Sequence, residues 1–196
     1  MTAVIILAAG SSSRFGSAKQ NLNYKGETLL QLAVNNAVKV SDTVLVVLGA
    51  NRDDIEFSIK DKPVKILYNP LWAEGMASGI RLAIEKLQGD YLAITQVMIM
   101  LCDQPFADAA VLRNLMETDT EKGIIASKYN DIVGVPVLFK AKYFPYLIAL
   151  QGKEGAKKLL ELHLDDVEPV NFPLGSVDID TTADWDNLNN QSDQNE

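Results

Sequence analysis

Two cations and two glycines stand close together directly after the first apolar segment of the chain. Residues 7–22 read LAAGSSSRFGSAKQNL and contain Gly10, Arg14, Gly16 and Lys19. Glycines let the backbone approach a ligand closely, and a turn rich in exposed N–H groups can bind phosphate oxygens. Arginine offers a planar fork and lysine a compact point charge, so the segment suits a polyphosphate. The spacing matches neither G-x-G-x-x-G nor the Walker A pattern, and the alternative interpretation is a flexible turn with two solvated cations.

A carboxylate follows the longest apolar run of the chain. The segment LCDQP, residues 101–105, places Asp103 where a buried strand should emerge. There it could hold a hard divalent cation such as Mg²⁺, which takes one or two carboxylates together with phosphate oxygens and waters. The alternative is a turn that leads into the next helix, because Asp and Pro are ordinary turn residues.

A pair of carboxylates lies near the C-terminus, in DIDTTAD at residues 178–184. On a short strand Asp178 and Asp180 would point to the same side, which suits a metal. The competing interpretation makes Asp180 or Thr181 the N-cap of a last helix, with Asp184 in its first turn.

The segment NPLWAEGMASG, residues 69–79, joins a predicted strand to a predicted helix and could position a base or ribose. In the alternative, Trp72 anchors this loop to the core. For Cys102 we favour packing over chemistry, because a lone buried cysteine usually acts as a small hydrophobe. His163, on a predicted helix, is interpreted as a surface or core residue.

The elements that must position these residues alternate between apolar β-rich runs and segments of helical period. This alternation is typical of an α/β domain with a largely parallel sheet. In such sheets ligands bind outside the carboxyl ends of the strands, where the segments above lie. We expect the strand at 134–139 to run antiparallel, because Pro136 favours an edge or a strand start. Strands are predicted at 3–8, 43–49, 64–68, 91–101, 123–127, 134–139 and 167–172, and helices at 27–40, 52–59, 77–87, 108–121, 140–149, 154–164 and directly after 178–185.

Length and composition predict one domain. The 196 residues are 47% hydrophobic, enough for a sizeable core over residues 1–188, whereas the polar segment 189–196 is expected to be a disordered tail. Lys and Arg number 18 against 26 Asp and Glu, a net charge of −8 that argues against nucleic acid or an anionic membrane as partner. An anionic ligand must therefore meet local cations or a metal ion.

The cysteine content and the N-terminus indicate the cellular setting. A single cysteine excludes an internal disulfide, and the first residues lack the basic region of a signal peptide, so we expect a cytoplasmic protein, by default a monomer. The apolar run 91–102 is shorter than the ~20 residues that cross a bilayer and is interpreted as a buried strand.

Together these segments resemble the nucleotidyltransferases that complete the molybdenum cofactor, and in particular their cytidylyltransferase branch. The N-terminal pattern of that family is matched throughout residues 7–19. The branch's C-D-Q-P, G-x-P-v-l-F, G-x-x-G-A and D-I-D-T correspond to residues 102–105, 134–139, 152–156 and 178–181. Its middle motif is matched, with Gly79 in place of a serine, by Asn69, Trp72, Gly75, Met76, Ala77, Ser78 and Ile80.

The resemblance implies a Rossmann-like three-layer nucleotidyltransferase domain with a mostly parallel mixed sheet. It implies transfer of CMP from CTP to the terminal phosphate of molybdopterin with release of pyrophosphate, and a molybdenum hydroxylase as a possible recipient. Arg14, Lys19 and Asp103 would be catalytic, and Asp103 and Asp180 would hold Mg²⁺. The residues implied to bind the nucleotide are Leu7, Ala8, Ala9, Gly10, Ser11, Ser12, Arg14, Lys19, Asn69, Gly75, Met76, Ala77 and Ser78.

Base choice is implied by Ala9, because the guanylyltransferase branch has glycine there and a methyl group would crowd a purine. Two alternative functions stay open. One is a related nucleotidyltransferase that acts on a sugar phosphate or an isoprenoid-precursor phosphate and shares this type of loop. The other is a non-catalytic module that hands the cofactor to a molybdenum hydroxylase, although the presence of Arg14, Lys19 and Asp103 together favours turnover.

Overall fold

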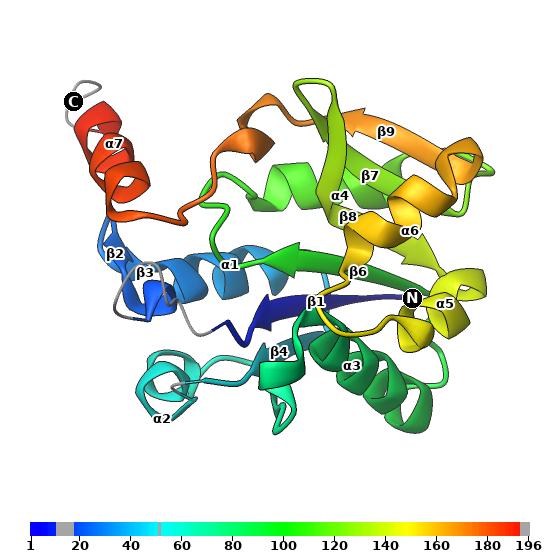
Figure 1. The fold of residues 1–196 in the computed structure, drawn as a ribbon, viewed down its shortest axis with the longest axis horizontal. Coiled ribbons are helices and arrows are strands. Elements are labelled where there is room, and N and C mark those ends of the chain that lie inside the picture. The colour runs from blue at the N-terminus through cyan, green and yellow to red at the C-terminus, as the bar shows by residue number, and fades with distance from the viewer. Residues whose placement is uncertain (11–17, 51, 193–196) are drawn as a thin grey trace.

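A mixed, mostly parallel sheet forms the centre of the molecule (Figure 1). The computed structural model describes residues 1–10, 18–50 and 52–192, and in this part of the chain seven strands pair in the order β5-β4-β1-β6-β8-β7-β9. Strand β8 is antiparallel to both neighbours, and the other pairs are parallel. The predicted α/β class is therefore confirmed. The strands are β1 (Thr2–Ala8), β4 (Val44–Leu48), β5 (Lys65–Tyr68), β6 (Gln96–Leu101), β7 (Ile124–Tyr129), β8 (Ile132–Lys140) and β9 (Val167–Asn171).

Helices cover both faces of this sheet and complete three layers, because side chains alternate along each strand and both faces are apolar. In β1, Ala3, Ile5 and Leu7 pack with α3 (Met76–Asp90), α5 (Phe144–Ala149) and α6 (Ala156–Leu162). The intervening side chains pack with α1 (Leu29–Ala37) and α4 (Ala109–Glu117) on the other face, beside the short α2 (Arg52–Glu56).

The last helix, α7 (Thr182–Ser192), packs away from the main sheet against the hairpin of β2 (Asn23–Tyr24) and β3 (Glu27–Thr28). Tyr24 and Trp185 meet edge to face there. Helix α7 includes the first four residues of the segment expected to be a tail, and 193–196 lie outside the described residues. No helix in the described ranges is both long and apolar enough to span a membrane.

Pro136 corrects one expectation. Its strand is antiparallel as predicted, but β8 lies inside the sheet and is not an edge. A bulge resolves the conflict: the register of β8 against β7 shifts between Ala126 and Ser127, and the Ser127 hydroxyl donates to Pro136 O at 2.8 Å. Proline lacks an N–H and is tolerated inside a sheet at such a bulge.

The long apolar run was predicted to be strand from residue 91, which is wrong for its first five residues. Helix α3 continues to Asp90, and the chain must turn before it can enter β6 at Gln96. Leu92 in this turn is 89% exposed. The turn is tied to the start of β1, because Thr95 N donates to Met1 O at 3.0 Å.

Candidate functional site

A cavity of about 360 Å³ opens where β1, β5 and β6 end. This is the edge of a parallel sheet at which ligands bind. Most of the residues predicted for the site line the cavity, namely Leu7, Ala8, Ala9, Gly10, Lys19, Asn69, Gly75, Met76 and Asp103. Arg14, Ser11 and Ser12, also predicted for the site, lie outside the described residues.

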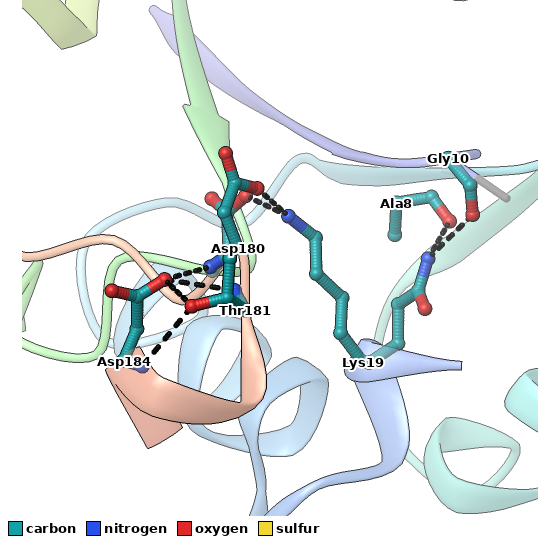
Figure 2. A network of polar contacts seen from close by, with 8 residues as sticks. Ala8, Gly10, Lys19, Asp180, Thr181 and Asp184 are labelled. Atoms are coloured by element: carbon teal, nitrogen blue, oxygen red, sulfur yellow. Dashed lines mark hydrogen bonds and ion pairs between the residues drawn. The ribbon is translucent and has the colours of Figure 1, made fainter. Parts of the chain in front are cut away.

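Lys19 joins two acids from distant parts of the chain. It begins the 3₁₀ turn η1 (Lys19–Asn21), and its Nζ lies 2.6 Å from Asp103 Oδ2 and 2.8 Å from Asp180 Oδ1 (Figure 2). Burial alone would lower the pKa of Lys19, but the charge of Asp103 and the hydrogen bonds to both acids outweigh it and raise this pKa above its ordinary value. The ammonium therefore stays charged at neutral pH.

Only one of the two carboxylate oxygens of Asp103 is engaged by Lys19. Its Oδ1 is buried and has no hydrogen-bond partner among the described residues. An unpaired buried carboxylate oxygen is costly, and a divalent cation is one group that would satisfy it. With Asp180 on the same ammonium, two carboxylates are available, so these residues fit a hard divalent cation that takes its other ligands from substrate and water. Within the described ranges no group of three or more His, Cys, Asp and Glu forms a metal site.

Asp180 is held in place from two sides. Ile179 N donates to Asp103 O at 3.0 Å, and the buried Ile179 side chain anchors the segment. On the other side Thr181 caps α7: Asp184 N donates to the Thr181 hydroxyl at 3.2 Å, and Thr181 N donates to Asp184 Oδ2 at 2.8 Å (Figure 2). Thr181 thus serves as the cap, while Asp180 faces Lys19.

The short strand expected at Asp178 and Asp180 does not form: residues 177–180 have no regular secondary structure. Asp178 nevertheless lies near the other acids. Burial, and after it the charges of Asp103 and Asp180, raise the pKa of its carboxyl.

Gln20 is a site residue that sequence analysis missed. Its side chain is buried, and its Nε2 donates to Ala8 O at 2.9 Å and to Gly10 O at 3.1 Å. These bonds hold the backbone between β1 and the glycine-rich segment against η1. No sequence signal singles out a glutamine whose partners are backbone carbonyls.

Ala77 and Ser78 do not line the cavity but support the loop that does. Ala77 is fully buried in the core. The buried Ser78 hydroxyl accepts a hydrogen bond from Asn69 Nδ2 at 2.8 Å and lies 2.9 Å from Leu71 O and 2.8 Å from Gly75 O. Asn69 is thereby fixed at the cavity wall.

Small residues bring Trp72 to the cavity wall, so Trp72 is more than an anchor to the core. A Cβ on Gly49 would lie 2.5 Å from Trp72 Cβ and 2.9 Å from Ala9 Cβ, so the Ala9 methyl and the tryptophan pack over a bare Cα. At Gly79, which replaces the serine of the motif, a Cβ would lie 3.3 Å from Val47 Cγ1, so the space there is tight.

Cys102 reaches the cavity wall with an unreactive thiol. Burial, with a contribution from the charge of Asp103, raises its pKa to about 12. The thiol therefore stays protonated at neutral pH, which agrees with a packing role.

Comparison with known proteins identifies relatives of this architecture. Residues 4–167 match the family model described as MobA-like NTP transferase domain. The chain is 27% identical to the molybdenum cofactor cytidylyltransferase of Escherichia coli (strain K12), over 68% of this chain and 67% of that protein. It is 30% identical to the nicotine blue oxidoreductase of Paenarthrobacter nicotinovorans, over 80% of this chain and 79% of that protein.

A solved structure shares the whole fold. Rv0371c from Mycobacterium tuberculosis H37Rv, in complex with manganese, superposes with a TM-score of 0.77 at 26% identity, covering 95% of this chain and 97% of that one. A protein of the same architecture thus forms a complex with manganese.

Proposed function

The chain belongs to the MobA-like NTP transferase family, and from this premise we propose that it transfers CMP from CTP to the terminal phosphate of molybdopterin and releases pyrophosphate. The observation that carries the proposal is Lys19 held between Asp103 and Asp180 beside the cavity, with the buried Asp103 Oδ1 unpaired. This set suits a triphosphate and a divalent cation. The similarity to a molybdenum cofactor cytidylyltransferase supports the choice of substrates.

In the reaction, an oxygen of the acceptor phosphate forms a bond to the α-phosphorus of CTP while the bond from that phosphorus to the bridging oxygen of pyrophosphate breaks. The acceptor phosphate is already ionised at neutral pH, so no general base is needed. His163 does not line the cavity and packs edge-on against Tyr143 and Tyr146, with ring centroids 5.1 and 5.2 Å away. It is therefore not placed to act as a base in this reaction. The protein has to position the two substrates and stabilise charge.

Lys19 supplies a fixed positive charge for the triphosphate, and Arg14, five residues earlier in the sequence, would offset the charge of the departing pyrophosphate. Gln20 holds the backbone at Ala8 and Gly10. A Cβ on Gly10 would have no atom of the described residues within 4 Å, so Gly10 leaves room for a phosphate to approach. Asp103 and Asp180 would hold Mg²⁺. When bound, the ion would polarise the α-phosphate and offset the charge of the incoming acceptor.

For base choice we propose that Ala9 and Trp72 limit the width of the cavity. Both residues line it, and they pack together over Gly49. A pyrimidine is smaller than a purine, so a cavity of limited width favours CTP over GTP. Methyl-sized differences in a pocket discriminate by about 1–3 kcal/mol, so we expect CTP to be preferred over GTP by roughly tenfold or more.

The test is pyrophosphate release from CTP and from GTP, with a molybdopterin-type acceptor and Mg²⁺. For Asp103→Asn we expect a kcat lower by on the order of 10²–10³, because the variant lacks a carboxylate that would hold the Mg²⁺ ion that stabilises charge in the transition state, while CTP still binds. Asp61→Asn, which changes an exposed aspartate outside the cavity, is the matched control and should behave as the native chain does.

Other outcomes would redirect the assignment. No release from either nucleotide with a folded protein and an active acceptor would contradict the proposal. Release with a sugar phosphate or an isoprenoid-precursor phosphate in the same panel would indicate the related transferases. CTP or pterin binding without any release would indicate a carrier of the cofactor.

A further inference from the structure

Two loops that are far apart in the sequence meet beside the cavity. Residues 69–75 join β5 to α3, and residues 150–155 join α5 to α6 (Figure 1). Ala77 N, in the first turn of α3, donates to Gly152 O at 3.2 Å. The first N–H groups of a helix have no partner within it, so the second loop satisfies one that would otherwise be unpaired.

Arg81 ties the same loops together a second time. Its Nη1 donates to Leu150 O at 3.2 Å, and its Nη2 lies 3.1 Å from Glu74 Oε2. The loop 150–155 is therefore fixed against the segment that carries Gly75 and Met76 into the cavity wall.

Glycines make the contact between the loops close. Gly75 has φ +123°, and a Cβ on it would lie 2.4 Å from Gly152 O. A Cβ on Gly155 would lie 2.5 Å from Met76 Sδ. The Met76 thioether thus packs on the bare Cα of Gly155, while the residue as a whole is 42% exposed and lines the cavity.

We propose that Gly155 is a positioning residue for nucleotide binding: it leaves the space in which Met76 lies, and Met76 in turn contacts the bound nucleoside triphosphate. This inference rests on the proposed function. A thioether is polarizable and makes favourable contacts with aromatic rings such as a nucleobase. Met76 is 42% exposed, and its Sδ lies over Gly155, so its position depends on the space that Gly155 leaves.

Gly155 offers a clean test because its backbone does not require glycine. Its φ of −127° and ψ of −170° are extended values that alanine adopts without strain, in contrast to Gly75. In Gly155→Ala the added methyl displaces the Met76 side chain. We expect the Kd of CTP, measured by titration with Mg²⁺, to rise about two- to tenfold, the size of a lost sulfur–ring contact.

Two further variants separate positioning from a structural effect. In the Met76→Ala background the displaced side chain is gone, so Gly155→Ala should then leave the Kd of CTP unchanged. In turnover, Gly155→Ala should raise KM and leave kcat intact, because Met76 is not among the residues proposed to hold the metal ion or to offset the charge of the departing pyrophosphate. Gly89→Ala, in α3 with open space around it, is the control and should change neither constant.

The outcomes are distinguishable. If the native chain binds no nucleoside triphosphate, the proposed function fails and this inference fails with it. If the native chain binds CTP and Gly155→Ala binds it equally well, this inference alone is wrong. It is also wrong if Gly155→Ala weakens binding as much in the Met76→Ala background, since a deformed loop would then be the cause.

Discussion

Lys19 is the residue on which the polar side of the cavity depends. Its ammonium group makes two charge-assisted hydrogen bonds, to Asp103 and Asp180, and without it these two carboxylates would repel each other at a partly buried site. A magnesium ion in this place would serve the same purpose of joining two acids. The lysine and a cation are thus two ways of satisfying one pair of carboxylates.

Lys19→Met tests this equivalence. We expect a loss of about 1.5–3 kcal/mol in the free energy of unfolding, the usual cost of a lost hydrogen bond to a charged group. An ion held by Asp103 and Asp180, as we propose, would take the place of the ammonium, so added Mg²⁺ should raise the Tm of the variant more than that of the native chain. Lys19→Arg keeps the charge but not the compact ammonium, so it should preserve more stability than activity. An equal response of the native chain and Lys19→Met to Mg²⁺ would contradict this view.

At the scale of elements, Thr181 links the start of α7 to the position of Asp180. Thr181→Ala removes the N-cap, so we expect a loss of about 1 kcal/mol in stability. Since Asp180 directly precedes the cap, the Mg²⁺ concentration needed for half-maximal activity should also rise.

Thr28→Ala is the matched control for this prediction. Thr28 caps α1 in a reciprocal pair with Gln31, and it does not line the cavity. Stability should fall by a similar amount with no change in the Mg²⁺ requirement. A similar Mg²⁺ shift in both variants would show that the effect is general and not transmitted through Asp180.

Sequence periodicity predicts most elements of this fold, because strands buried on both faces and amphipathic helices leave distinct patterns. The prediction from periodicity was wrong at two places where tertiary contacts determine the local structure. Residues 91–95 are largely apolar but form a turn, because the chain must reverse direction between the end of α3 and the start of β6. Pro136 lies inside the sheet because a bulge accommodates it.

In the site, too, some residues could be predicted from the sequence and others could not. The positions of Lys19 and Asp103 could be predicted from charged residues that follow strands. Gln20, in contrast, donates to backbone carbonyls, and Gly155, although it belongs to the matched motif at 152–156, contacts Met76 only because it lacks a side chain. Such roles depend on what lies nearby in space, and a single sequence does not report that.

At the scale of the whole molecule, a second polar cluster lies at the end of the sheet opposite the cavity, where β7 and β9 begin. Asp166 lies 2.6 Å from Lys142 Nζ, accepts from the Tyr143 hydroxyl at 2.6 Å, and accepts from Gly123 N, directly before β7, at 3.0 Å. The Lys142 hydrogen bond, and after it the Tyr143 hydrogen bond, lower the pKa of Asp166 to about 2 from its ordinary 3.8.

Asp166→Asn should therefore change the acid stability of the protein and not its activity. A carboxyl with a lowered folded-state pKa stabilises the fold fully above its unfolded-state pKa, and this stabilisation is lost as pH falls through the folded-state value. The difference in unfolding free energy between native chain and variant should be constant above about pH 5 and should shrink towards pH 2.

The exposed neighbour Asp165 provides the control for this measurement. Asp165→Asn should leave the acid limb of the stability curve unchanged. The interpretation would be wrong if Asp166→Asn altered kcat, or if its effect on unfolding were the same at pH 3 and pH 7.

The separation of the site's charged groups along the chain has a consequence for biosynthesis. Asp103 follows Lys19 by 84 residues and Asp180 follows it by 161. At roughly 5–20 residues per second, the ribosome delivers the second acid several seconds after the first. By then β1, β4, β5 and β6, all N-terminal to Asp103, have already been synthesised. The ion pairs that Lys19 makes with both acids can therefore not be complete until residue 180 has been synthesised, so any chain that terminates between residues 103 and 180 lacks one of the two carboxylates.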